Sequence, residues 1–314
     1  MSLSALPMVS DADVRSVITV GDAVEVVQRT YADFGQARLS LSRPAITRIG
    51  DGTRGFGLKG ALLDRYGVAG VRVTPTHASG GNSWCLVLES ESGRPLVAVE
   101  ETWLHRLRTA ASAAVAARLL ARPDSRVLTL VGAGRIARFV PAAFAAAFEL
   151  TEIRVVATSA GSAASFAAGQ SVPGVTLTSG TDLDAAAPGS DVVVAITSAR
   201  RPAVRPRHLL PGGTLIGLGG GAEIAAEVLT ATADRFFVDD LGYARETGSV
   251  ASWLGGGLSP DAVDGHLTGT LPAVAAGLLP GRVAPADRIL AVVQGVAACD
   301  VALACLTMRR LGIA

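Results

Sequence analysis

Residues 127–137 read VLTLVGAGRIA, an apolar run that ends at Gly132-Ala133-Gly134. A buried parallel strand that turns tightly into a helix needs this pattern, because Gly132 permits the turn and Gly134 lets the backbone approach a pyrophosphate. The small Ala137 lets the helix pack closely on the strand. An Ala-rich helical stretch and a second apolar run follow, which completes a β-α-β unit. The alternative is a tight glycine turn in an unliganded sheet. We assign five residues of this turn to a dinucleotide site: Gly132, Ala133, Gly134, Arg135 and Ile136.

The composition excludes several other classes of protein. The chain has 314 residues, of which 49% are hydrophobic, and its net charge is +1. That balance indicates a well-packed globular protein and gives no support to nucleic acid or a membrane surface as a partner. No apolar run approaches the ~20 residues of a membrane-spanning helix. The N-terminus lacks the pattern of a signal peptide, so we expect a cytoplasmic protein.

The cysteines and histidines give no sign of a metal site. The chain has three cysteines and four histidines, and their spacing does not match any arrangement of metal ligands. An odd number of cysteines without a signal peptide favours reduced thiols. We therefore predict no bound metal.

The first hundred residues and the middle of the chain follow different patterns. Residues 10–35 carry valines at helical spacing, which predicts one or two helices. Short apolar segments separated by turn residues predict strands over 45–49, 67–75, 84–90 and 96–100. A helix-forming segment over 109–121 then leads into strands that alternate with helices, as in a doubly wound parallel sheet. We expect its strands over 126–131, 152–157, 175–178, 191–196, 213–218 and 235–239.

The last stretch, residues 286–312, reads as one long apolar helix. Its apolar surface must pack against another part of the protein. We expect it to return to the N-terminal region and to support a subunit interface. The predicted fold class is α/β, with a Rossmann-type doubly wound parallel sheet plus a mixed α+β substrate and dimerisation domain formed by the N-terminal segment and the C-terminal helix. The predicted domains are residues 1–108 with 286–314, and residues 109–285.

Two further loops lie at the carboxyl ends of the predicted strands, where ligands bind in open α/β sheets. Thr197 and Ser198 follow the strand over 191–196, and a hydroxyl group there can reach ribose or nicotinamide. A helix N-cap is an equally good interpretation of these two residues. Gly217 and Leu218 begin a glycine-rich run over 217–221, which suggests the close approach of a flat group. We add these four residues to the predicted dinucleotide site.

The end of the second strand indicates which dinucleotide is bound. An acidic residue there binds the ribose 2′-hydroxyl of NAD and repels the 2′-phosphate of NADP. Residues 156–162 read VATSAGS and contain no acid, whereas the hydroxyl groups of Thr158, Ser159 and Ser162 can donate hydrogen bonds to a phosphate. We therefore predict NADP. NAD remains the alternative, because the loop carries no arginine.

Three arginines are candidates for binding the substrate. Arg108 precedes the predicted helix over 109–121, between the two predicted domains, where it can hold a carboxylate by two parallel hydrogen bonds. The dipole of that helix disfavours a surface arginine at its start. Arg72 lies within the apolar strand over 67–75 and needs an anionic partner there. Arg43 precedes Pro44. A structural role is an equally good interpretation for each of the three.

The segments around these residues resemble one known family. Residues 89–125, which contain the block Leu107-Arg108-Thr109-Ala110-Ala111, are similar to the strand, turn, strand and helix that precede the glycine turn in the ornithine cyclodeaminase/μ-crystallin family. Residues 233–240, 246–248, 281–282 and 295–300 also match the family's pattern. The resemblance implies an NAD(P)-binding domain, a split substrate and dimerisation domain, and a homodimer. Members of the family include cyclodeaminases, amino-acid dehydrogenases, ketimine reductases and opine-like synthases.

The resemblance also implies roles for single residues. The arginine of the R-T-A-A block is Arg108, the ligand of the substrate carboxylate, and Thr109 beside it is assigned to the cofactor site. An earlier family arginine falls on Arg43. The active-site lysine of the family falls on Arg72, with Lys59 as an alternative further upstream.

The chain departs from the family where cyclodeaminases carry an aspartate that activates the substrate amine. Residues 217–227 read GLGGGAEIAAE, with no acid at the matching position and no lysine, and Glu223 is the nearby carboxylate. The family's serine before the last helix is also absent, since residues 291–293 read AVV. An arginine at position 72 stays charged and cannot shuttle a proton. These departures argue against cyclisation of ornithine.

We therefore predict an NAD(P)-dependent oxidoreductase that acts on a small α-imino or α-amino acid. Hydride transfer needs a positioned nicotinamide, an electrophilic C=N or C=O carbon and a clamp for the substrate carboxylate. Arg108 and Arg43 hold the carboxylate in this prediction, Arg72 polarises the reacting centre, and Glu223 or water supplies the proton. One alternative is an ornithine cyclodeaminase-like ammonia lyase that uses bound NAD. The other is a non-catalytic NADP-binding protein.

Overall fold

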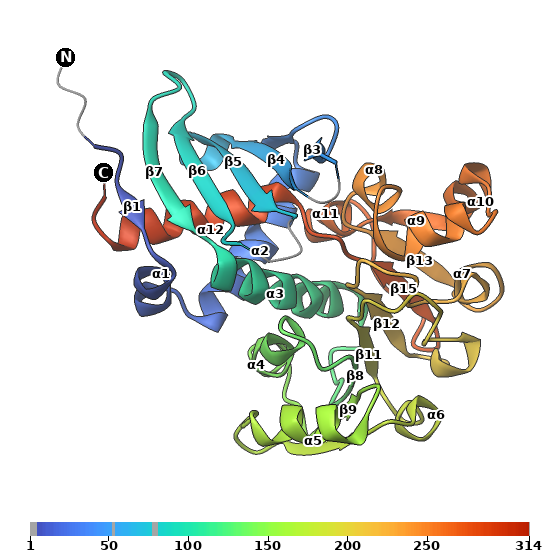
Figure 1. Cartoon of the computed structure of the whole chain (residues 1–314). Coiled ribbons are helices and arrows are strands. Elements are labelled where there is room, and N and C mark those ends of the chain that lie inside the picture. Colours follow the sequence, from blue (N-terminus) through green and yellow to red (C-terminus); the bar gives the residue numbers. More distant parts are fainter. Residues whose placement is uncertain (1–4, 52–53, 77–80, 314) are drawn as a thin grey trace.

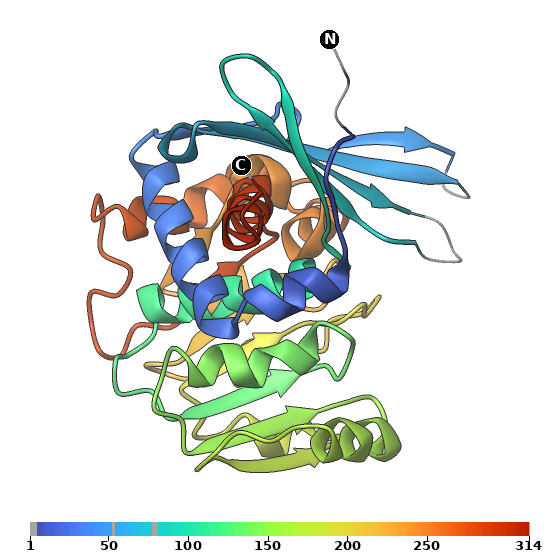
Figure 2. The ribbon, with the colours of Figure 1, turned by 90° about the vertical axis from the view of Figure 1, so that its left-hand side faces the viewer.

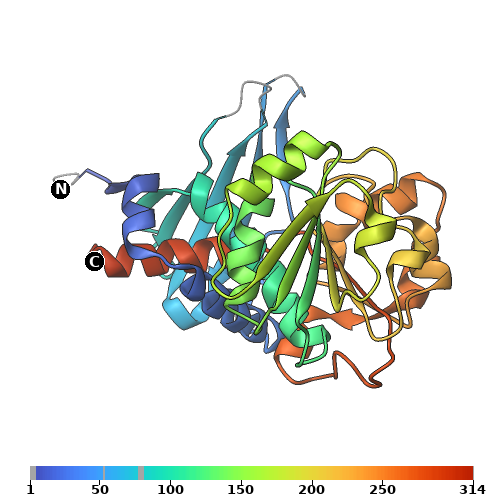
Figure 3. The same cartoon turned by 90° about the horizontal axis from the view of Figure 1, so that it is seen from below.

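The computed structural model describes residues 5–51, 54–76 and 81–313, which form two sheets joined by long helices (Figure 1). The larger sheet has the strand order β10-β9-β8-β11-β12-β15-β13-β14, and every neighbouring pair is parallel. The order reverses between β8 and β11, which is the switch point where ligands bind in this type of sheet. Figure 3 shows these strands from below, fanned out by the twist of the sheet. They are β8 (Val127–Val131), β9 (Glu152–Val156), β10 (Thr176–Gly180), β11 (Val192–Ala195), β12 (Thr214–Gly217), β13 (Arg235–Val238), β14 (Leu267–Thr270) and β15 (Ile289–Val292).

The six strands predicted for the middle of the chain are confirmed, and the structure adds β14 and β15. The prediction of a single helix over 286–312 is wrong in its first part. Residues 289–292 form β15, fully buried between β12 and β13, and the helix α12 (Ala297–Arg310) begins only after a loop. A strand that is buried on both faces is apolar at every position, so periodicity cannot separate it from a buried helix. The predicted domain ranges stay a prediction.

Short helices connect the parallel strands. Five of them have a side-chain cap, in which the side chain accepts a hydrogen bond from a backbone N–H of the first helical turn. The capping residues are Ser159, Asp182, Asp240, Ser259 and Thr270. The connecting helices are η2 (Ala137–Phe139), α4 (Val140–Ala145), α5 (Ala160–Ala168), α6 (Leu183–Ala186), η3 (Pro206–His208), α7 (Ala226–Ala231), α8 (Leu241–Ala244), α9 (Gly248–Gly255), α10 (Pro260–His266) and α11 (Leu271–Ala275).

The smaller sheet has the order β1-β7-β6-β5-β4-β2, with β3 paired to β4, and apart from the parallel pair β1–β7 its neighbours are antiparallel. The four strands predicted in this region are present within two residues of the expected bounds. The long β4 was not predicted, because three glycines interrupt its apolar pattern. The elements are β1 (Met8–Val9), β2 (Leu39–Leu41), β3 (Thr47–Gly50), β4 (Gly55–Leu63), η1 (Asp64–Tyr66), β5 (Val68–Pro75), β6 (Trp84–Glu89) and β7 (Pro95–Glu100).

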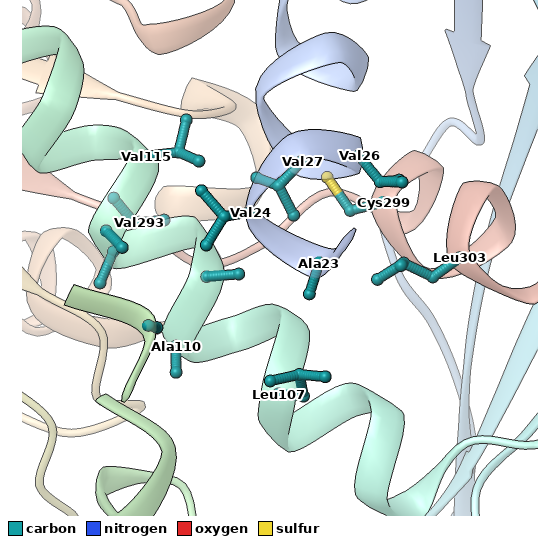
Figure 4. Packing of buried hydrophobic residues seen from close by; sticks show 14 of the residues in the cluster. Ala23, Val24, Val26, Val27, Leu107, Ala110, Val115, Val293, Cys299 and Leu303 are labelled. Carbon is teal, nitrogen blue, oxygen red and sulfur yellow. The ribbon is translucent and has the colours of Figure 1, made fainter. Parts of the chain in front are cut away.

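The C-terminal helix returns to this smaller sheet, as predicted. α12 lies under one face of the sheet (Figure 2). The contact is close, because a Cβ atom at Gly70 of β5 would lie 2.7 Å from the side chain of Val301. Beside α12 lie α1 (Asp11–Val17) and α2 (Val20–Gly35). Figure 4 shows side chains of α2, α3 and α12, among them Val24, Ala110 and Leu303, meeting in the core.

The helix α3 (Thr102–Leu120) runs between the two sheets and packs against α2, α4 and α12. It begins several residues earlier than the predicted start at 109. Arg108 therefore lies in the second turn of the helix, so the predicted position at a helix start, where the dipole disfavours a cation, is wrong. In the described part of the chain no helix is long and apolar enough to span a membrane.

Candidate active site

A pocket of about 510 Å³ opens at the carboxyl ends of β8, β9 and β11, at the switch point of the larger sheet. Six of the residues predicted for the dinucleotide line it: Gly132, Ala133, Gly134, Thr158, Thr197 and Ser198. The other predicted cofactor residues are outside its lining. These are Thr109, Arg135, Ile136, Ser159, Gly217 and Leu218.

The glycine turn fits the passage of a pyrophosphate. Gly132 has a φ of +121°, and its N–H donates a hydrogen bond to the carbonyl oxygen of Val156 at 2.8 Å. A Cβ atom there would overlap the carbonyl of Ile196, so only glycine closes this turn. At Gly134 a Cβ atom would have no neighbour within 4 Å, so the backbone faces open space beside the pocket. The cradle therefore suits a group that approaches the main chain closely.

The end of β9 carries hydroxyl groups. Thr158 and Ser162 line the pocket, and Ser159 caps α5 by accepting a hydrogen bond from the N–H of Ser162 at 3.2 Å. Among the described residues no acidic side chain lines this pocket. The wall therefore carries no charge that would repel a 2′-phosphate.

Glu223 joins the two loops that follow β11 and β12. Its carboxylate accepts hydrogen bonds from the N–H and the hydroxyl of Thr197, at 2.7 and 3.1 Å, and from the N–H of Gly219 at 2.7 Å. The side chain is fully buried, and burial raises the pKa of this carboxyl above its usual value. The helix N-cap interpretation of Thr197 and Ser198 is wrong, because no helix begins there.

In the glycine-rich run over 217–221, Gly217, Gly219 and Gly221 pack against protein, whereas Gly220 is exposed. A Cβ atom at Gly219 would overlap the Glu223 carboxylate and the carbonyl of Thr197, and one at Gly221 would lie 2.5 Å from the carbonyl of Ala199. At Gly219 and Gly221 the glycine is therefore required by the neighbouring loop of the protein, and not by a flat ligand. Gly217 and Leu218 are buried at the end of β12.

A cluster of buried charges lies where α3, α12 and the smaller sheet meet. The Arg108 side chain is 1% exposed, and its Nε donates a hydrogen bond to Oδ1 of Asp300 at 2.6 Å. Its Nη2 lies 3.0 Å from Nδ1 of His105. The third nitrogen, Nη1, is buried without an acceptor among the described residues. A buried donor of this kind marks a place for an anionic acceptor.

Arg72 has found the anionic partner that its buried position requires. Its guanidinium forms a buried ion pair with Glu101, the residue that precedes α3, and its Nε lies 3.9 Å from Oδ1 of Asp300. Sequence reasoning missed Glu101, His105 and Asp300 as members of this cluster. The position of Arg72 in a buried strand indicates that it has an anionic partner, but strand and helix patterns do not identify which acidic residue pairs with it.

Burial and mutual attraction set the protonation of this cluster. Burial alone would raise the pKa of Asp300, but Arg108 and Arg72 hold it well below its usual range. Burial raises the pKa of Glu101 to about 7, against the attraction of Arg72. Burial and the two arginines lower the pKa of His105 to about 3, so this ring is neutral at physiological pH. The cluster thus keeps two permanent cations.

Lys59 faces the same cluster from β4, directly opposite Arg72 in the register of β4 and β5. Its Nζ donates a hydrogen bond to the carbonyl of Gly295 at 2.6 Å and lies 3.8 Å from the ring centroid of Tyr243. The space around it is small, a pocket of about 10 Å³ lined in part by Asp240. Burial lowers the pKa of Lys59 to about 7.

Arg43 is not brought into this cluster. Its side chain is 68% exposed, and its Nη1 lies 3.3 Å from Oδ2 of Asp240 at the start of α8. The structure therefore brings together Arg72, Arg108 and Lys59, and leaves Arg43 exposed outside this cluster.

The charge cluster and the pocket share one edge of the larger sheet. Gly295, which contacts Lys59, follows β15, and β15 is the neighbour of β12. Gln294 donates a hydrogen bond from Nε2 to the carbonyl of Gly219 at 3.3 Å, so the loops after β15 and β12 touch. A Cβ atom at Gly295 would overlap the Arg108 guanidinium. A small molecule held by Arg108 would therefore lie close to the loop after β12, which Glu223 connects to the pocket-lining loop after β11.

The model of the family described as the ornithine cyclodeaminase/mu-crystallin family matches residues 65–311. A putative dehydrogenase of Rhizobium meliloti is 31% identical over 244 residues, which cover 74% of this chain and 71% of the relative. A Δ1-pyrroline-2-carboxylate/Δ1-piperideine-2-carboxylate reductase of Azospirillum brasilense is 27% identical over 250 residues, 78% of this chain and 80% of the relative.

Solved structures have the same fold. The crystal structure of a probable ornithine cyclodeaminase from Bordetella pertussis matches with a TM-score of 0.87 and 28% identity, over 98% of this chain and 97% of the other. An archaeal alanine dehydrogenase, a dimer with bound NAD, matches with a TM-score of 0.88 and 23% identity, over 97% and 95% of the two chains.

Proposed function

Because this chain belongs to the ornithine cyclodeaminase/mu-crystallin family, we propose that it is an NAD(P)-dependent oxidoreductase that reduces the C=N bond of a small α-imino acid. The observation that carries the proposal is the position of the Arg108 cluster at the same sheet edge as the glycine-turn pocket. An arginine with an unpartnered, buried Nη1 can bind a substrate carboxylate there. The relatives named as a dehydrogenase and as an imino-acid reductase support this class of reaction.

A second candidate is the cyclodeaminase reaction, which the probable ornithine cyclodeaminase of B. pertussis brings into consideration. That reaction needs a group that binds the second amine of a diamino acid. Residues 217–222 carry no carboxylate, and the oxygens of Glu223 accept hydrogen bonds from Thr197 and Gly219. The loop after β12 therefore has no free acid for an amine, which favours reduction of a substrate with a single nitrogen.

The residues of the chain supply binding and orientation. A dinucleotide held by Gly132, Gly134 and the hydroxyl groups of Thr158 and Ser162 supplies the hydride when it is bound. Arg108 holds the carboxylate of the imino acid, so that its α-carbon faces the loops after β11 and β12. Arg72, neutralised by Glu101, keeps Asp300 and Arg108 in place rather than contacting the substrate. We propose NADP as the natural dinucleotide, since none of the described residues that line the pocket is acidic.

The first prediction concerns the consumption of the cofactor. We expect NADPH to be oxidised when the protein is mixed with Δ1-pyrroline-2-carboxylate or another cyclic ketimine acid, with kcat/KM about tenfold or more above the value for NADH (about 1.4 kcal/mol). Absorbance of the reduced nicotinamide measures this directly. Release of ammonia from ornithine without net oxidation would support the cyclodeaminase reaction instead. Tight binding of NADPH without turnover on any imine would indicate a non-catalytic binding protein.

We also propose that the protein works in the cytoplasm. All three cysteines are buried and free, which suits a reducing compartment.

We further propose that the protein is a homodimer. α12 covers one face of the smaller sheet, and Figure 2 shows no helix over the opposite face. The opposite face, here called the outer sheet face, is apolar and half-exposed, and a second copy would cover it. It consists of Phe56, Leu58, Leu62, Ala69, Val71, Val73, Trp84, Leu86, Leu88 and Ala98.

The second prediction tests this interface. Leu86→Asp places a charge in the centre of the outer sheet face, and we expect it to weaken dimerisation about 100-fold or more, because a buried unpaired carboxylate is costly. Light scattering coupled to gel filtration reads the mass of the assembly. Leu278→Asp is the matched control, since Leu278 is 68% exposed and lies outside this face. A monomeric wild type, or a Leu86→Asp variant that remains dimeric, would contradict the proposed interface.

A further inference from the structure

Lys59 is the single lysine of the chain. The sequence contains 28 lysine and arginine residues together, and the other 27 are arginines. Arginine stays charged in proteins, whereas lysine can lose its proton when it is buried. Lys59 is thus the one basic side chain, among the lysines and arginines, that can change its charge. It is 5% exposed and lies in the buried cluster of the candidate site.

The contacts of Lys59 leave its amine free of any carboxylate partner in the structure described. Nζ touches the carbonyl of Gly295 and the ring of Tyr243, and no ion pair to it is formed. The nearby acids are already paired with arginines. Arg72 forms an ion pair with Glu101, and Arg108 forms one with Asp300. The charged and titratable groups that face Lys59 come from β5, α3, the loop after β13, α8 and α12. They are Arg72, Arg108, Asp239, Asp240, Tyr243 and Asp300.

The other members of the cluster are poorly suited to proton transfer. The two arginines do not release protons, and His105 is neutral with Nδ1 facing Arg108. Burial raises the pKa of Glu101 to about 7, but its carboxylate is engaged in the ion pair with Arg72. The carboxylate of Asp239 accepts hydrogen bonds from the N–H groups of Asp240, Gln294 and Gly295, and that of Glu223 from Thr197 and Gly219. Lys59 remains as a group that can gain and lose a proton beside Arg108.

We infer that Lys59 is the proton donor of the proposed imine reduction, a role that rests on the proposed function. As the hydride of the reduced dinucleotide forms a C–H bond at the imine carbon, the electron pair of the C=N π bond moves to nitrogen. Nitrogen takes the proton of the Lys59 ammonium, which leaves an amine, and solvent then protonates Lys59 again. The products are the amino acid and the oxidised dinucleotide, so electrons and protons balance. The reverse reaction uses the neutral Lys59 as the base.

The protonation of Lys59 fits this role and sets a pH dependence. Burial first, and then repulsion by Arg108 and Arg72, lower its pKa to about 7. A general acid works best when its pKa lies near the working pH. Reduction needs the protonated amine, so kcat/KM in that direction is expected to be constant below this midpoint. Above it, the value should fall about tenfold per pH unit. Oxidation of the amino acid needs the neutral amine and should show the opposite slope.

The single lysine allows a direct test that does not depend on activity. Protein produced with 13Cε-labelled lysine gives one side-chain resonance, and its shift as a function of pH reports the ionisation of Lys59. We expect a midpoint near 7 for Lys59. Arg94→Lys, at a surface position where the arginine is 59% exposed, adds a reference resonance that should titrate near ~10.4. Titration of Lys59 together with this reference would overturn the inference.

Kinetics provide the third prediction. Lys59→Met should lower kcat/KM for the imine by about 10²–10⁴-fold and remove the fall above neutral pH. Lys59→Arg keeps the charge but cannot transfer the proton, so it should be similarly impaired. The affinity for NADPH, measured by fluorescence titration, should change less than about twofold in both, because Lys59 lies outside the glycine-turn pocket.

The outcomes separate this inference from the proposed function. If the wild type reduces no imine, the proposed function fails and the inference fails with it. If the wild type reduces an imine and Lys59→Met retains both the rate and the pH profile, the proposed function stands and the inference alone is wrong.

Discussion

Replacing Arg108 with alanine is expected to lower kcat/KM for the imino acid by about 10²–10³-fold. Truncation of one partner in a buried, hydrogen-bonded charge pair costs about 2–5 kcal/mol, and every 1.4 kcal/mol is a factor of ten. The same change leaves Asp300 buried without its main partner, because Nε of Arg108 is 2.6 Å from Oδ1. We therefore also expect the free energy of unfolding to fall by roughly 3–5 kcal/mol. Steady-state kinetics and urea unfolding measure the two effects.

A double variant separates binding from stability. Arg108→Met combined with Asp300→Leu replaces the charge pair by apolar side chains, which often restores stability. It should recover much of the unfolding free energy and none of the activity. Arg65→Ala is the matched control, because it removes an arginine that pairs with Asp33 at 2.5 and 2.6 Å far from the site. A folded Arg108→Ala protein with the kcat/KM of the wild type would show that Arg108 does not bind the substrate.

Glu223→Ala is expected to weaken both the fold and the binding of the dinucleotide. The substitution leaves the N–H groups of Thr197 and Gly219 without their acceptor, at a cost of about 1–3 kcal/mol for each buried donor. The loops after β11 and β12 lose their connection, and Thr197 lines the pocket. Since a displacement of about 1 Å in a site can cost about 100-fold, we expect the KM for NADPH to rise at least about tenfold.

The glutamine variant distinguishes a positioning residue from a proton donor. Glu223→Gln keeps the shape of the side chain but turns one acceptor into a donor, which opposes either Thr197 or Gly219. A positioning role predicts a partial loss of stability and a raised KM with a smaller change in kcat. A variant as stable as the wild type that loses kcat alone would restore the assignment of Glu223 as the proton source. Glu227→Ala, on the exposed side of α7, is the control.

The sequence predicted the parallel sheet well, because glycine turns and apolar runs are local signals. Six strands and the turn at Gly132 were found in this way, and six of the predicted cofactor residues line one pocket. β15 was read as helix because a strand that is buried on both faces has no alternation. β4 escaped notice because of its glycines, and with it the position of Lys59 opposite Arg72.

The candidate site was harder to predict, because its contacts join distant segments. The expectation that Arg72 needs an anionic partner was correct, but only the packing of β5 against the start of α3 identifies Glu101. Arg43 was a candidate from its place before Pro44 and from the resemblance, but its side chain is 68% exposed and pairs with Asp240. Glu223 looked like a spare acid because its three hydrogen bonds come from loops that meet only in the folded protein.

Arg108 and Asp300 lie far apart in the sequence, and this separation affects when the chain can fold during its synthesis on the ribosome. Arg108 and Asp300 are 192 residues apart, and Lys59 is 236 residues from the carbonyl that it contacts. At about 5–20 residues per second, the ribosome needs about 10–40 s after making Arg108 to supply its partner. The helix α3 cannot be buried favourably before then, because its arginine would lose water without gaining a counter-charge. The smaller sheet therefore packs stably against α3 only after α12 has been synthesised, and until then Arg108 stays hydrated.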